Sequence, residues 1–394
     1  MRCAVNDLWT EAGYVSLNKR GETLCGDRVE IAGGGERDVT MVLADGLGSG
    51  VKANILATLT SKIVCTLADG GMPIEEWVST VASTLPVCSV RQVAYSTFTL
   101  VRIVDNRMAH IVQFDNPATI VLREGEPLAY PATTRTVAGK TIWESAFPVQ
   151  CGDVFICLSD GAEYAGTGRT LNFGWSREAI AQFASANYLP QNAAKSTAGL
   201  IADECNRLYG GEPGDDTTVA VLRVRRRHSV NLVVGPPADS AQDMTMMNLF
   251  FTKDGAKVVC GGTTSRLAAD YLGKPLVPTL DYPDPEVPPV STIEGVELVT
   301  EGVVTLSKVL SYARDYLDSA RLAQSWATGG DGASQIAREL FENATDIHFF
   351  VGRAINPAHQ NPDLPITFGV KQQLIQSLAD CLERMGKHIR LSYF

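Results

Sequence analysis

The pattern of hydrophobic and polar positions in the first 225 residues predicts antiparallel sheets flanked by pairs of helices. Strands and helices come in separate runs, which is not the alternation of a doubly wound sheet. The turn dipeptide Asp105-Asn106 separates two of the strands. The elements expected here are, in chain order, a strand at 39–44, helices at 50–68 and 73–85, a strand meander at 95–123, a strand at 153–159, helices at 176–186 and 191–209, and a strand at 217–225.

The first of these helices has an apolar stripe at helical spacing, which predicts that it is amphipathic. The stripe consists of Val51, Ile55, Leu59, Ile63 and Leu67.

From residue 231 onward, strands alternate with helices. This rhythm predicts a second, smaller α/β domain with a parallel sheet, so the chain is divided into domains at 1–227 and 228–394. The Pro-rich stretch 273–290 has too few adjacent apolar side chains to form an element of its own. The expected strands are 232–234, 257–260, 296–300, 347–351 and 388–393, and the main helices are 264–272 and 368–385.

Composition narrows the class of protein. The chain has 394 residues, 45% of them hydrophobic, and a net charge of −10, which argues against a nucleic-acid binder. The one basic run, 223–228, is read as a solvated strand end and linker. Without a signal pattern or an apolar run of about 18 residues, no membrane association is expected and a cytoplasmic location follows. The nine cysteines form no CxxC pair and are read as reduced thiols.

Acidic residues recur at the edges of the predicted strands, most of them beside glycine. They are Asp27 in CGDRVE, Asp45 in LADGLGSG, Asp160 in LSDGAEY, and Asp215 with Asp216 in PGDDTTVAV. A carboxylate beside a residue without a side chain can reach an ion that water and phosphate also approach. Aspartates brought together would repel one another, so such a fold needs cations. Hard oxygen ligands favour Mg²⁺ or Mn²⁺ over zinc.

In order and spacing, these four motifs resemble those of the metal-dependent protein serine/threonine phosphatases, in the branch of stage II sporulation protein E (SpoIIE). The resemblance covers residues 1 to about 225 and implies an αββα sandwich of two antiparallel sheets flanked by helix pairs. It implies two ions, with Asp27 ligating one, Asp45 bridging both beside the Gly46 carbonyl, and Asp160 ligating the second. In the last motif Asp215 is the favoured ligand, and Asp216 stays an alternative.

Two further residues bear on this resemblance. Asp115 stands where some relatives carry an acid for a third ion, but an Asx turn before Pro117 is the favoured interpretation. No arginine matches the one that holds the substrate phosphate in some relatives, because Arg28 follows Asp27 directly and on a strand faces the opposite way. The glycines of DGLGSG also suggest a dinucleotide or phosphate loop, but their spacing fails that motif.

In the C-terminal domain, the stretch CGGTTSRLAADYLG at 260–273 is a strand end, a Gly-Gly turn and a helix start. Capping by Thr263 or Thr264 is one interpretation, and an anion held by backbone amides is the other. Ser334 is read as a helix cap.

The sequence therefore predicts a Mn²⁺- or Mg²⁺-dependent hydrolase that removes phosphate from serine or threonine of a bacterial regulatory partner. The alternative is a catalytically weak or inactive phosphatase fold that acts as a scaffold, binding a phosphorylated partner or a small ligand through its C-terminal domain. A homodimer and a small ligand on that domain are further candidates among its partners.

Overall fold

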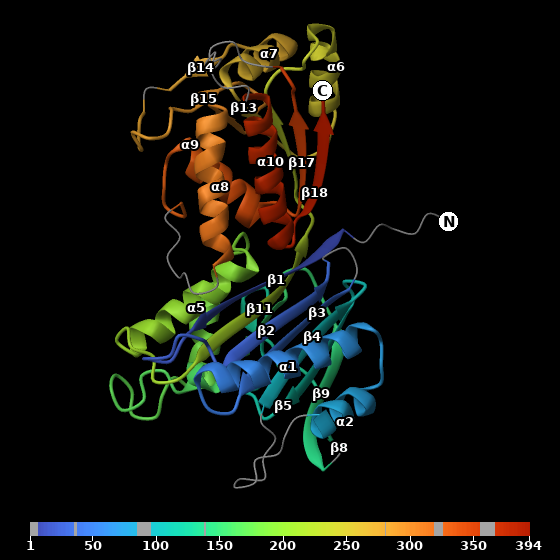
Figure 1. Cartoon of the computed structure of the whole chain (residues 1–394), viewed down its shortest axis with the longest axis vertical. Coiled ribbons are helices and arrows are strands. Elements are labelled where there is room, and N and C mark those ends of the chain that lie inside the picture. Colours follow the sequence, from blue (N-terminus) through green and yellow to red (C-terminus); the bar gives the residue numbers. More distant parts are fainter. Residues whose placement is uncertain are drawn as a thin grey trace. The chain divides into compact units, whose positions relative to one another are not determined.

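The computed structural model describes residues 7–34, 38–84, 96–137, 139–279, 281–318, 326–354 and 367–394. The chain forms two compact units, with the change from one to the other between Arg226 and Arg227. The N-terminal unit has two sheets and the C-terminal unit has one (Figure 1).

The N-terminal unit contains two antiparallel sheets. In spatial order, one sheet consists of β1 (Leu8–Leu17), β11 (Thr217–Arg226), β10 (Val154–Leu158), β6 (Ile120–Arg123) and β7 (Glu126–Pro127). The other consists of β2 (Asp27–Gly33), β3 (Val39–Gly46), β4 (Ser96–Val104), β5 (Met108–Phe114), β9 (Lys140–Pro148) and β8 (Thr133–Val137). Every strand pair in both sheets is antiparallel, as predicted.

The two sheets face each other across a shared core. Met41 and Leu43 from one sheet are fully buried together with Phe155 and Leu222 from the other. Outside the sheets lie α1 (Gly50–Asp69) and α2 (Ile74–Thr84) on one side, and α4 (Arg177–Ala186) and α5 (Ala194–Leu208) on the other. The predicted αββα sandwich is therefore confirmed. The predicted end of the second helix, residue 85, lies outside the described residues.

Turns and hairpins of this unit follow from its residues. Asp105 and Asn106 both have a left-handed backbone, which is the conformation of a tight hairpin turn and fits the predicted role of this dipeptide. The β8–β9 hairpin, with Gly139 at its turn, is an addition that the sequence pattern did not predict.

Only the second half of the apolar stripe of α1 packs against the core, where Ile63 and Leu67 are partly buried. Val51, Ile55 and Leu59 are 59%, 54% and 46% exposed, while small side chains such as Ala53 and Ala57 are fully buried against the sheet. Small residues let the helix axis come close to the strands, which a stripe of larger side chains would prevent. By length and composition α1 is also apolar enough to cross a membrane, a feature that the sequence analysis did not expect.

The basic run at the end of β11 is only partly the solvated strand end that its composition suggested, because Arg226 is exposed while Arg223 and Arg225 are buried. Arg223 is only 2% exposed and donates to three main-chain carbonyls of residues 189–192. Arg225 is buried beside Glu11, with 3.5 Å between Nε and Oε2. A strand buried on both faces needs such partners for its charged side chains.

The C-terminal unit is a mixed sheet with helices on both faces. Five strands run parallel in the order β16 (Leu298–Thr300), β13 (Ala256–Cys260), β12 (Ser229–Val234), β17 (Asp346–Val351) and β18 (His388–Tyr393). The Pro-rich excursion adds a short antiparallel edge of β14 (Val277–Pro278) and β15 (Ser291–Thr292), so it does form a small element. The parallel sheet is as predicted, apart from this edge.

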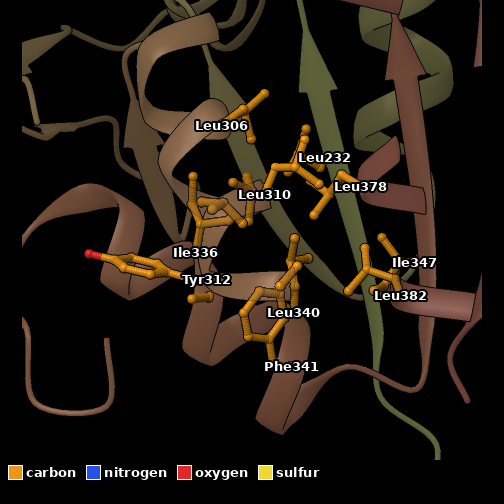
Figure 2. Close-up of a cluster of buried hydrophobic side chains, with 14 of the residues drawn as sticks. Leu232, Leu306, Leu310, Tyr312, Ile336, Leu340, Phe341, Ile347, Leu378 and Leu382 are labelled. Atoms are coloured by element: carbon orange, nitrogen blue, oxygen red, sulfur yellow. The ribbon is translucent and has the colours of Figure 1, made fainter. Parts of the chain in front are cut away.

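One face of this sheet holds the larger core, which Figure 2 shows in close-up. There α8 (Val303–Leu317), α9 (Gly332–Ala337), the π-helix η2 (Arg338–Asn343) and α10 (Thr367–Arg384) place Leu306, Leu310, Leu340 and Leu378 against Leu232 of β12. The other face packs against α6 (Asp243–Phe251) and α7 (Gly262–Leu272), and a short 3₁₀ turn, η1 (Ser240–Gln242), precedes α6.

Candidate metal centre

The predicted aspartates lie at strand ends in both sheets of the N-terminal unit. Asp27 begins β2 and is paired across the ladder with Asp45, near the end of β3. Asp160 begins α3 (Asp160–Glu163), two residues after β10, and Asp215 and Asp216 directly precede β11. Since β10 and β11 are neighbours, one end of each sheet contributes acidic side chains.

Glycines allow the segments that carry these aspartates to approach one another closely. A Cβ on Gly161 would lie 2.1 Å from the main-chain oxygen of Asp216, and one on Gly26 would lie 2.7 Å from Asp216 Oδ2. A Cβ on Gly46 would lie 2.1 Å from the main-chain oxygen of Ala53 in α1. Any side chain at these positions would push the acidic segments apart, so the glycines are required by packing.

Asp27 is the most buried member of the group. It is 4% exposed, and neither of its carboxylate oxygens has a hydrogen bond of good geometry, although the hydroxyls of Ser159 and Thr218 lie close enough to affect its pKa. Burial raises its pKa to about 7; the hydroxyls of Ser159 and Thr218 oppose this rise, and the charge of Asp216 adds to it. A buried carboxylate without partners is costly, so this side chain is suited to a cationic ligand.

The charges of all four other aspartates affect the pKa of Asp45. Burial, then the charges of Asp27, Asp160, Asp215 and Asp216, raise its pKa to about 9. Burial and the charge of Asp215 also raise the pKa of Asp160, while contact with the Asp45 carboxyl lowers it. The five aspartates therefore form one electrostatically coupled group, centred on Asp45.

The two aspartates of the last motif are held differently. Asp215 Oδ1 lies 3.2 Å from the ammonium of Lys19, whereas Asp216 Oδ1 accepts from the main-chain N–H of Lys19 at 2.9 Å. Oδ2 of Asp216 is buried without a partner, and burial raises the pKa of this carboxyl. Both side chains lie near the group, so the choice between Asp215 and Asp216 as a ligand stays open.

The chemistry of this group fits a divalent cation that prefers oxygen ligands. The group consists of aspartates, so it offers oxygen ligands alone. Asp27 and Asp216 together have three buried oxygens without partners. Among the residues that the structure describes, no three His, Cys, Asp or Glu side chains converge as a finished metal-binding cluster. The structure therefore places the predicted side chains close enough to affect one another's pKa. Their roles as metal ligands stay predictions.

Other candidates have different surroundings. Asp115 is exposed, and its left-handed backbone, with φ of 53°, suits a turn residue. Arg28 is exposed while Asp27 beside it is buried, so the two face opposite sides of the strand as expected. Lys19, Ser159 and Thr218 were missed as site residues. Lys19 lies eight residues before Asp27 in a stretch that also contains Arg20 and Arg28, so nothing in the local sequence singled it out.

Comparison with known proteins identifies the N-terminal unit. The sequence profile of the family described as Stage II sporulation protein E (SpoIIE) matches residues 35–225. This range includes Asp45, Asp160 and Asp215, and Asp27 precedes it. No curated protein matches the chain.

Solved structures of low sequence identity resemble between 55% and 62% of the chain. The PP2C phosphatase domain with a regulatory fragment of SpoIIE from Bacillus subtilis is 19% identical, with a TM-score of 0.48, covering 56% of this chain and 64% of that one, which is less than two thirds. The RsbU and RsbW domains of a Mycobacterium tuberculosis protein are 14% identical, with a TM-score of 0.45 and coverages of 62% and 68%. RsbX in complex with magnesium is 18% identical, with a TM-score of 0.40 and coverages of 55% and 96%.

Proposed function

We propose that this chain hydrolyses phosphoserine or phosphothreonine on a regulatory protein. The proposal starts from residues 35–225, which are a SpoIIE-type segment of the PPM superfamily of metal-dependent phosphatases. The observation that carries the proposal is the coupled group of aspartates. Asp27 and Asp45 face each other across the ladder, and their pKa values of about 7 and about 9 reflect carboxylates that need a cation.

Within this proposal, each acidic side chain has a place. Asp27 and Asp160 each hold one of two ions, Asp45 lies between them as the bridge, and Asp215 completes the set. The Gly46 carbonyl lies beside the bridge. Bound Mn²⁺ or Mg²⁺ supplies an activated water and stabilises the charge that develops on the phosphoryl oxygens.

The residues of the chain have further roles in this reading. Lys19 holds Asp215 through its ammonium and Asp216 through its main-chain N–H, so it positions both acids of the last motif. Ser159 and Thr218 help to keep the buried Asp27 ionised, since their hydroxyls lower its pKa. Arg28 faces away from the group, so the substrate phosphate is bound without an arginine from this position.

The partner and the setting follow from the same proposal. A bacterial regulatory phosphoprotein in the cytoplasm is the substrate, as relatives of this branch imply, and the C-terminal unit of residues 228–394 binds a partner or senses a ligand. The net charge of −10 is unfavourable for nucleic acid as a partner.

Hydrolysis of a phosphate-ester dye by the full chain, with Mn²⁺ and with a chelator, tests the activity. We expect Mn²⁺-dependent turnover and a loss of at least about a hundredfold in Asp45→Asn, because several kcal/mol of transition-state stabilisation depend on the ions. The matched control is Asp203→Asn, an exposed aspartate of α5, which leaves turnover unchanged.

Two results would contradict the proposal. Equal turnover by the Asp45→Asn variant would remove Asp45 from the site. A wild-type chain that shows no turnover with Mn²⁺ but captures a phosphorylated partner would replace the enzyme with the scaffold.

A further inference from the structure

The carboxyl edge of the parallel sheet in the C-terminal unit brings two helix starts together. β13 and β16 are paired so that Cys260 lies opposite Thr300, and each strand leads through glycine into a helix, α7 or α8. The two glycines are close, since a Cβ on Gly302 would lie 3.4 Å from the Cα of Gly261. This is the edge of an open α/β sheet outside which ligands bind, although the strand order reverses between β12 and β17 and not between β13 and β16.

The start of α7 is not capped in the way the sequence suggested. The N-cap is Gly261, which makes no side-chain cap, and neither Thr263 nor Thr264 takes that position. Ser334 is likewise inside its helix, where Asp331 is the cap. Of the two interpretations of CGGTTS, capping by threonine is therefore wrong, and the anion interpretation remains.

Donors at the start of α7 lack acceptors. Within the described part of the chain, no protein group accepts from the N–H of Gly262, Thr263 or Thr264. The hydroxyl of Thr264 is also without a partner, although the residue is only 1% exposed. A buried hydroxyl without a hydrogen bond is unfavourable, so an acceptor supplied by a ligand would stabilise it.

The hydroxyl of Thr264 is directed to the turn that precedes the helix. Its Oγ1 lies 3.3 Å from the place where a Cβ of Gly261 would be. Gly261 has φ of 109°, a conformation that favours glycine, and the turn therefore keeps its backbone uncovered. Gly262 and Thr263 are exposed, so the N–H groups of the first turn are within reach of a ligand.

A carboxylate of this chain already lies against the same turn. Glu301 Oε2 accepts from the N–H of Gly302 at 3.0 Å, and Oε1 is 3.6 Å from the place where a Cβ of Gly262 would be. The side chain of Glu301 is exposed, so it can move aside. Negative charge is thus accommodated at the paired helix starts, where the helix dipoles favour it.

We propose that Gly262, Thr263 and Thr264 bind the phosphate group of a small molecule, with Glu301 as a built-in competitor for the same place. Three N–H groups and one hydroxyl match the several acceptor oxygens of a phosphate, as at other helix N-termini. The inference concerns the C-terminal unit alone and does not depend on the proposed phosphatase activity.

The test uses inorganic phosphate and the full chain in the presence of a chelator, with binding followed by phosphorus NMR. We expect saturable binding that Thr264→Val weakens about tenfold, since one hydrogen bond to a charged group is lost. Glu301→Gln is expected to strengthen binding, because a competing charge is removed. Acetate, which has two oxygens, is expected to bind more weakly than phosphate.

Thr305 provides a matched control. Thr305 is the third residue of α8, as Thr264 is the third residue of α7. It is fully buried, and its hydroxyl also has no partner. Thr264→Val and Thr305→Val should both raise the thermal midpoint in phosphate-free buffer, because each removes a buried unpaired hydroxyl, but only Thr264→Val should weaken phosphate binding.

The proposal is overturned if the two valine variants bind phosphate equally, if acetate binds as tightly as phosphate, or if wild-type binding does not saturate. Loss of phosphatase activity in other variants would leave these outcomes unaffected, so the two proposals fail separately.

Discussion

Replacing Asp45 with asparagine should stabilise the metal-free chain while it removes activity. Burial and the neighbouring acids raise the pKa of this carboxyl from 3.8 to about 9. At pH 7 the side chain is therefore protonated in the folded chain and ionised in the unfolded chain. Unfolding then releases a proton, and the folded state loses stability as the pH rises.

The magnitude follows from the size of this shift. A carboxyl whose pKa is raised on folding makes its full contribution to the free energy of unfolding below about pH 4. This contribution decreases between about pH 4 and pH 9, by no more than about 1.4 kcal/mol per pH unit. Over the three or so units between the unfolded pKa and pH 7, the free energy of unfolding falls by at most about 4 kcal/mol. Because Asp27 and Asp160 titrate together with Asp45, this value is an upper limit for the single site.

Asparagine has nearly the same shape and is neutral at every pH. In chelator at pH 7, Asp45→Asn should therefore have a free energy of unfolding higher than wild type by up to about 4 kcal/mol, with a flatter dependence on pH. Added Mn²⁺ should stabilise wild type strongly and the variant much less, because only the carboxylate binds ions well.

Urea unfolding in chelator, from about pH 5 to pH 8, measures both effects. The exposed Asp203→Asn serves as the control and should follow wild type throughout. If the metal-free Asp45→Asn chain is no more stable than wild type at pH 7, or has the same pH dependence, the acids near Asp45 do not act on one another as the structure indicates.

Two further substitutions test how the N-terminal unit is packed. Gly161→Ala should lower the free energy of unfolding by about 1–3 kcal/mol, because its Cβ would lie 2.1 Å from the main-chain oxygen of Asp216. The control is Gly199→Ala, whose Cβ would have its nearest atom at 3.9 Å, and it should be neutral or stabilising in urea unfolding. Arg223→Met should cost about 2–4 kcal/mol because the main-chain carbonyls of residues 189–192 lose the guanidinium as a donor, although the Leu189 carbonyl keeps the N–H of Asn192. The exposed Arg226→Met should change the thermal midpoint little, and equal effects would contradict the buried role of Arg223.

The order of elements could be predicted because it depends on local periodicity, but the packed face of α1 could not. A stripe of large apolar residues such as Val51 and Ile55 is the usual sign of the buried face. Here the close approach of helix and sheet selects Ala53 and Ala57 instead, and that distance is a property of the whole layer. Periodicity therefore located the helix correctly, but it indicated the wrong packing face for the first half of the helix.

The contacts of the charged residues also could not be predicted from the sequence. Arg223 was read as a solvated residue because its neighbours are basic, yet its partners are carbonyls more than 30 positions away in the chain. Lys19 likewise meets Asp215 across 196 positions. Local composition carries no information on such contacts, which arise only when distant segments of the chain meet in the fold.

Asp27 shows how the strand register supplies what family resemblance leaves open. It lies before the matched range of residues 35–225, so its place in the site depends on β2. Val29, on the same face two residues later, is 4% exposed and packs into the core between the sheets. A slip of one residue would bury Arg28 and turn both Asp27 and Val29 outward, which would cost the apolar contact and the acid together. The burial of Val29 therefore fixes Asp27 opposite Asp45, so a hydrophobic contact of the core determines the geometry of the acidic site.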